Sequence, residues 1–151
     1  MNAPVQWHPM VVHFPLALII TAAAMLLLAR CSRGSMAEAL AVAGTWNLCL
    51  GAIAALFAIG TGMAAVLDLH LAVAAKEAVS IHVKWALFTS VALLLLAVWR
   101  GAGNAQNSRP SWLFLLVLLA ATAALIETGY RGGQNVYRFG VGVERAAPSG
   151  S

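Results

Sequence analysis

Four long apolar segments, joined by short connectors, constrain this chain more than any other feature of its sequence. A helix needs about 20 apolar residues to cross the hydrocarbon core of a bilayer. By that measure the sequence predicts membrane-spanning helices at about 9–29, 43–67, 79–99 and 111–128. Because the connectors are short, consecutive helices should be antiparallel neighbours. The expected fold class is therefore all-α, an integral membrane antiparallel four-helix bundle.

The composition leaves no room for a separate soluble domain. Of the 151 residues, 62% are hydrophobic and only 9% are charged, whereas soluble domains carry about 25% charged residues. We expect one transmembrane domain over residues 1–145 and a flexible tail at 146–151. The net charge of +4 is spread over helix ends and forms no basic patch. The expected surroundings are thus the lipid bilayer, and no nucleic acid partner is expected.

The Lys and Arg residues near the helix ends predict the orientation of the chain. No basic residue precedes the first segment, whereas Arg30 and Arg33 follow it, and the last connector adds Arg100 and Arg109 to the same side. The opposite side carries five basic residues: Lys76, Lys84, Arg131, Arg138 and Arg145. We expect a multi-pass protein of the bacterial inner membrane with both termini periplasmic. This orientation rests on the basic residues that flank the first segment and on those in the shortest connectors.

All four histidines fall at the expected periplasmic end, and two of them lie at matched depth. His13 and His82 each sit about one helical turn inside the first and third segments. These segments should be diagonal in the bundle and face each other across its core, where bundles hold cofactors. Two imidazoles at one level suit axial ligation of a haem iron. The sequence therefore predicts one haem b bound between His13 and His82.

Residues near this pair bear on the haem prediction. Ala17 and Ala24 share a helical face with His13, as Ala86 and Thr89 do with His82, and small residues would leave room for a porphyrin. Such residues also mediate ordinary helix contacts in membranes. The haem propionates would need cationic partners. The candidates, which also fit as snorkelling interface residues, are Lys84, Arg131 and Arg138.

His8 and His70 are candidates for a second haem or a metal site. His8 is not on the helical face of His13, and it would alternatively bond to a propionate or cap the helix. His70 lies in a connector beside Asp68, where an interfacial histidine is the plainer interpretation. A metal ion without a porphyrin is the competing ligand. Zinc prefers four grouped Cys or His ligands, and copper would use histidine with methionine.

Glu127 is the other charge inside a predicted span. Ionisable groups at membrane depth usually mark function, so Glu127 is a candidate for carrying protons to or from a quinol. The alternative is an ion pair with Arg131, one helical turn further on.

Two terminal motifs resemble those of a known family. The run HPMVVHFPLAL at 8–18 matches an HPxxVHFPxAL opening, and GGQNVYRFGVGV at 132–143 matches a GGxxVYxxGVGV close. The chain thus resembles the small bacterial four-helix membrane proteins catalogued as domain of unknown function 2231. The resemblance implies that His8, His13 and His82 belong to the common pattern, and that redox proteins accompany the family. Phe139 stands where a histidine is usual, so that position offers no ligand here.

The predicted function is that of a small cytochrome b-like subunit without catalysis of its own. It would pass electrons between a periplasmic redox protein, such as a c-type cytochrome or a dehydrogenase subunit, and the quinone pool or a larger complex. Two haems are an alternative to one. The rival functions are a non-redox accessory or anchor subunit and a metal-binding membrane protein.

Overall fold

The computed structural model describes residues 3–67, 71–102 and 109–143, with side chains described from Trp7 onward. These residues form five helices: α1 Ala3–Val11, α2 His13–Cys31, α3 Gly34–Leu67, α4 Val73–Gly101 and α5 Trp112–Phe139. α1 and α2 together make one span, because the chain between them is interrupted only at Val12, whose backbone stays right-handed helical. All four spans are long and apolar enough to cross a membrane. The predicted all-α membrane bundle is confirmed.

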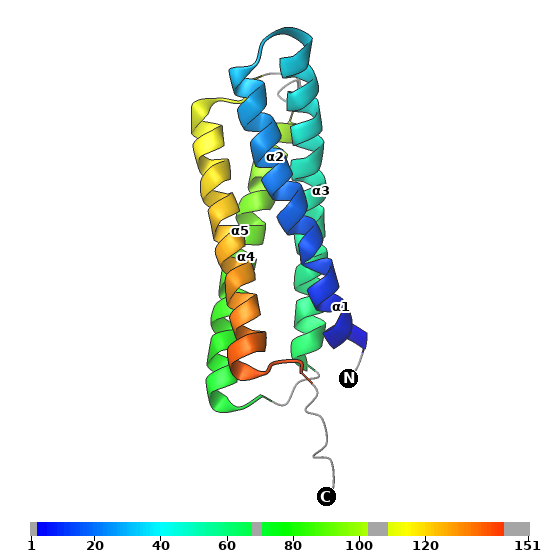
Figure 1. Cartoon of the computed structure of the whole chain (residues 1–151), viewed down its shortest axis with the longest axis vertical. Helices are drawn as coiled ribbons and strands as arrows, with labels where there is room; N and C mark the ends of the chain where they lie inside the picture. Colours follow the sequence, from blue (N-terminus) through cyan, green and yellow to red (C-terminus); the bar gives the residue numbers. More distant parts are fainter. Residues whose placement is uncertain (1–2, 68–70, 103–108, 144–151) are drawn as a thin grey trace, which may run out of the picture.

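The spans alternate in direction along the bundle, as Figure 1 shows. α2 and α5 pack on each other, as do α2 and α3, α3 and α4, and α4 and α5, while α1 packs on α3 and α2. Within the described residues, no Cα atom of α2 lies within 8 Å of one in α4, and the same holds for α3 and α5. The first and third spans are therefore diagonal, as expected. The start of α1 and the end of α5 lie at one end of the bundle, here named the histidine end.

The spans are longer than the predicted apolar segments, α3 and α5 by the most. α3 begins at Gly34, nine residues before the predicted start at 43, and α5 continues to Phe139, eleven residues beyond 128. Polar residues can stay helical beyond the hydrocarbon core because water and head groups solvate their side chains. α5 is also well delimited. The Ser111 hydroxyl accepts a hydrogen bond from the Phe114 amide at 3.1 Å, and Gly140 ends the helix at φ 63°.

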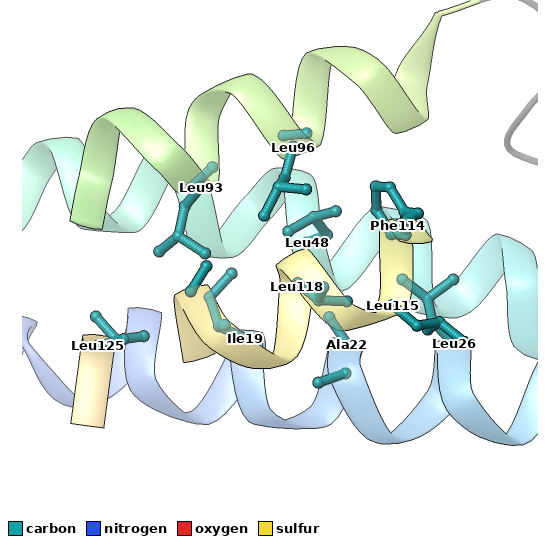
Figure 2. Close-up of a cluster of buried hydrophobic side chains, with 14 residues drawn as sticks. Ile19, Ala22, Leu26, Leu48, Leu93, Leu96, Phe114, Leu115, Leu118 and Leu125 are labelled. Atoms are coloured by element: carbon teal, nitrogen blue, oxygen red, sulfur yellow. The ribbon is translucent and has the colours of Figure 1, made fainter. Parts of the chain in front are cut away.

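A cluster of large buried side chains joins α2, α3, α4 and α5 away from the histidine end (Figure 2). Ile19, Leu26, Leu48, Leu93 and Leu118 are each fully buried in it. On the histidine side of the cluster, the described buried side chains are smaller: Pro15, Ala55, Ala65, Ala75, Val79, Thr128 and Asn135. One half of the bundle is thus closed by leucine packing, and the other half is lined by small residues.

The outward surface of the spans is apolar. Leu28, Phe57, Phe88, Leu95 and Leu116 are all exposed, each with more than half of its side-chain surface uncovered. In water such a surface would drive aggregation, whereas lipid tails match it. Contact with a lipid bilayer follows directly from this surface and from the length of the helices.

Candidate functional site

The imidazoles of His8 on α1 and His82 on α4 both lie at the histidine end of the bundle. Both side chains are half-buried, and the two rings interact electrostatically. α1 and α4 belong to diagonal spans, so the pair reaches across the bundle. In this region the fully buried side chains that the structure describes are small.

A hydrogen bond to Thr61 of α3 orients the ring of His8. Nδ1 of His8 lies 3.1 Å from Oγ1 of Thr61, whose own hydroxyl donates to the Ala58 carbonyl at 3.1 Å. Because that hydroxyl hydrogen is already used, Nδ1 of His8 is the donor and Oγ1 the acceptor. His8 therefore carries its hydrogen on Nδ1, which leaves the lone pair of Nε2 free.

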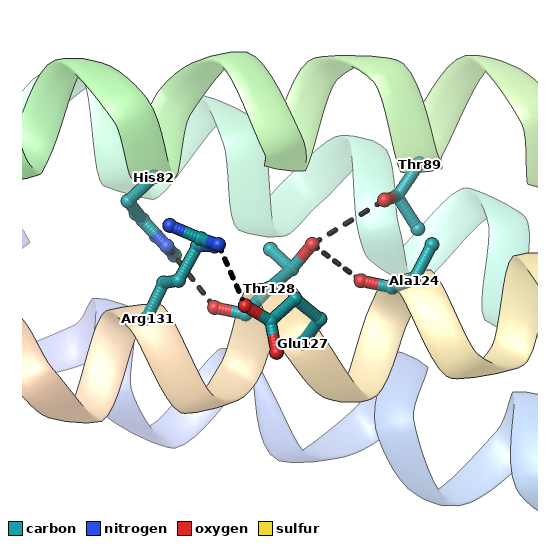
Figure 3. Close-up of polar contacts among 6 residues, drawn as sticks. All are labelled: His82, Thr89, Ala124, Glu127, Thr128 and Arg131. Carbon is teal, nitrogen blue, oxygen red and sulfur yellow. Dashed lines mark hydrogen bonds and ion pairs between the residues drawn. The ribbon is translucent and has the colours of Figure 1, made fainter.

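His82 is held in the same way by α5 (Figure 3). Its Nδ1 donates to the backbone carbonyl of Thr128 at 3.1 Å. The Thr128 hydroxyl adds a second polar contact between α5 and α4. It donates to the Ala124 carbonyl at 2.8 Å and lies 3.3 Å from the Thr89 hydroxyl of α4. Nε2 of His82 is again the nitrogen with a free lone pair. In metal sites, a hydrogen bond at one ring nitrogen fixes which nitrogen binds the metal.

A glycine backs each of the two rings. A Cβ on Gly62 would lie 2.9 Å from Cε1 of His8, and a Cβ on Gly132 would lie 3.1 Å from Cε1 of His82. Both distances are shorter than ordinary carbon–carbon contacts of about 3.5 Å or more. α3 thus contributes the Thr61 hydroxyl and Gly62 to the contacts of His8. α5 contributes the Thr128 carbonyl and Gly132 to the contacts of His82.

The structure does not bring His13 to His82. The ring of His13 is exposed, and its Nδ1 donates to the carbonyl of Pro9 on its own span at 2.7 Å. Ala17 and Ala24, expected beside it in the core, are exposed as well. The expected inward orientation of His13 is therefore not found.

The buried face of the first span explains this difference. Pro15, Ala22 and Ala29 are buried seven residues apart, with Ile19 and Leu26 between them. This is the heptad spacing of helices that pack at a shallow angle. His8 lies seven residues before Pro15 and continues the buried face, whereas His13 falls outside it. The seven-residue spacing of His8, Pro15, Ala22 and Ala29 is visible in the sequence, but only burial in the structure identifies it as the inward face.

The predicted cations are placed differently from one another. Lys84 and Arg138 are exposed. Arg131 is half-buried, and its Nη2 lies 2.8 Å from Oε1 of Glu127 (Figure 3). The predicted Glu127–Arg131 ion pair is confirmed. His70 lies outside the described residues.

Two imidazoles with free Nε2 atoms would suffice as the protein ligands of a haem iron, because the porphyrin provides the other four nitrogens. A zinc ion held by protein alone usually takes three or four protein ligands. Among the described residues, no group of three or more His, Cys, Asp or Glu side chains gathers at one place.

The chain as a whole was compared with known proteins. The model of the family described as "Predicted membrane protein (DUF2231)" matches residues 4–145. The chain belongs to this family. No curated protein and no solved structure matches it.

The two terminal motifs of this DUF2231 protein meet at the site. His8 comes from the opening motif at 8–18, and Gly132, which lies against His82, comes from the closing motif at 132–143. The motifs are more than 110 residues apart in sequence, so only the folded bundle places them together. The site thus uses both ends of the region that the family model matches.

Proposed function

We propose that this protein binds one haem b, whose iron His8 and His82 would hold, and transfers electrons as a cytochrome b-like membrane subunit. The observation that carries the proposal is the matched hydrogen bonding of the two rings. Each donates from Nδ1 to a protein oxygen, at 3.1 Å in both cases, and each therefore keeps Nε2 for iron.

The surroundings of the two rings also support the proposal. The fully buried side chains described at the histidine end are small, and the two histidine rings rest on Gly62 and Gly132. Among the described residues, the large buried leucines lie further along the bundle, where they close the core. Thr89, which the sequence predicted as one of the small residues near the haem, is buried on α4 beside Thr128.

When bound, the haem supplies one-electron transfer, and the protein supplies the ligands and the electrostatic surroundings. Thr61 and the Thr128 carbonyl hold the two imidazoles in one tautomer, and the apolar helices limit access of water. Lys84 and Arg138, exposed at the same end, remain the candidate partners for propionates. With both termini periplasmic, the site would lie on the side of a periplasmic redox partner, and electrons would pass to or from the quinone pool or a larger complex.

The test is a reduced-minus-oxidised absorption spectrum of the detergent-purified protein after haem-replete expression, with quantitation of haem. We expect one haem per chain, loss of the spectrum in His8→Ala and His82→Ala, and a normal spectrum in the matched control His13→Ala. Normal haem in both of the first two variants would refute the ligand assignment.

The same sample separates the rival functions. A wild-type protein that has no Soret band and binds no metal would favour an accessory or anchor subunit. Stoichiometric metal without porphyrin, found by elemental analysis, would favour a metal-binding membrane protein.

A further inference from the structure

Arg131 and Gln134 place two unpartnered polar atoms on one face of α5 next to His82. Nε of Arg131 and Oε1 of Gln134 are both buried, and neither has a hydrogen-bond partner within the described part of the chain. Residues three apart share a helical face. Thr128, three residues before Arg131 on that face, accepts the hydrogen bond from Nδ1 of His82. A buried donor and a buried acceptor are thus available together beside the candidate ligand.

The rest of the Arg131 guanidinium is already held in place. Its Nη2 pairs with Glu127 at 2.8 Å, and its central carbon lies 5.1 Å from the centre of the Trp85 ring. Figure 3 shows Arg131 rising from α5 toward His82 on α4. These contacts fix the direction of the free Nε–H group. Leaving a buried donor or acceptor unpaired costs about 1–3 kcal/mol, so a ligand that pairs both atoms gains that free energy.

The chemistry of the two atoms selects the ligand. A carboxylate offers acceptor oxygens only, and here it would face the acceptor oxygens of Glu127 and Gln134. A hydroxyl group both accepts from Nε–H and donates to Oε1. A ligand that reaches this site from the bilayer must also be lipid-soluble, and the adjacent Trp85 favours an aromatic ring. We propose that Arg131 and Gln134 bind the hydroxyl of a hydroquinone head group.

This proposal rests on the proposed electron-transfer function and names its substrate class, although the binding itself does not require haem. The proposed site should bind the two redox forms of the ligand with different affinities. The hydroquinone has the hydroxyl hydrogen that Gln134 accepts, whereas the oxidised quinone has only carbonyl acceptors. Arg131 can donate to both forms. The site should therefore bind hydroquinone more tightly than quinone, and Gln134 should be the source of the difference.

The test is anaerobic titration of the full-length protein in detergent with decylubiquinol and, separately, with decylubiquinone, monitored by calorimetry. We expect saturable binding that is about tenfold tighter for the quinol, since one hydrogen bond contributes on this order. Gln134→Leu should remove that preference, and Arg131→Lys, which keeps the charge opposite Glu127, should weaken both ligands about tenfold. Lys76→Gln, which removes an exposed cation at the same end, is the matched control.

Equal affinity of wild type and Gln134→Leu for the quinol, or absence of saturable binding, would overturn the proposal. An ordered water would then be the partner of Nε of Arg131 and Oε1 of Gln134. Gln134→Leu does not touch the ion pair of Arg131, so the test stands even if the Arg131 variant does not fold. Haem is measured on the same samples. Haem without quinol binding overturns this inference alone, whereas quinol binding without haem overturns the proposed function and leaves this site standing.

Discussion

Gly62 lies directly against the imidazole of His8, so closely that a Cβ built on the glycine would come within 2.9 Å of Cε1. The next residue back along α3, Thr61, accepts the hydrogen bond from Nδ1 of the same ring. Two consecutive residues therefore determine both the position and the tautomer of His8. His82 has the corresponding pair of contacts with Thr128 and Gly132.

Gly62→Ala should displace the ring of His8 and lower the haem content of the purified protein. The added methyl group meets the imidazole at 2.9–3.4 Å, and the ring can yield only by giving up its bond to Thr61. Gly60→Ala is the matched control, because its Cβ meets no atom within 4 Å. Haem per chain, from absorbance against protein concentration, is the measurement. Equal haem in the two variants would contradict the contact.

Thr61→Val should weaken haem retention, since it removes the oxygen that holds His8 in the tautomer with a free Nε2. Loss of such a supporting hydrogen bond lowers affinity for a metal centre about 10–100-fold. Thr61→Ser keeps the oxygen and should behave close to wild type. Competition for haem by apomyoglobin gives the dissociation rate of each variant. A valine variant that retains haem as well as the serine variant would show that Thr61 does not orient the ligand.

Gly44→Ala and Gly51→Ala should each destabilise the packing of α2 on α3, independently of any cofactor. A Cβ at Gly44 would lie 2.7 Å from Cγ of Leu26, and one at Gly51 would lie 2.7 Å from Cδ1 of Ile19, both fully buried side chains. Overpacking of this kind costs about 1–3 kcal/mol. The check is denaturation of the detergent-solubilised protein, with Gly60→Ala as reference. If Gly44→Ala and Gly51→Ala were as stable as Gly60→Ala, the interface between α2 and α3 would accommodate a methyl group, contrary to the structure.

Thr45→Val should destabilise the end of the bundle opposite the histidines. Arg100 is 4% exposed, and its Nε–H donates to the Thr45 hydroxyl at 3.2 Å. Valine keeps the shape of threonine but removes this acceptor from a buried charged group, at a cost of about 1–3 kcal/mol. Thr122→Val removes a buried hydroxyl whose bond goes to its own helix, to the Leu118 carbonyl. We expect Thr122→Val to lower the stability less than Thr45→Val in the same denaturation experiment. The difference between the two variants measures the contribution of the Arg100 contact.

The sequence by itself determined the four spans and the end at which the histidines gather. Apolar length and the scarcity of charge are properties of each segment alone, and they need no neighbour to be evaluated. The Glu127–Arg131 pair was equally predictable, because residues four apart on one helix meet whatever surrounds them.

Only the tertiary structure decided which histidine of the first span faces inward. In a soluble helix the polar side marks the surface, but here Phe14, Ile20 and Leu28 on the lipid side are as apolar as the buried Ile19 and Leu26. Lipid tails impose no contrast between the two sides. Close packing against α3 selects the inward face, and it selects the heptad of Pro15, Ala22 and Ala29 that His8 continues. The sequence predicted that His13 would lie at the depth of His82 and face it, but in the structure His13 is exposed.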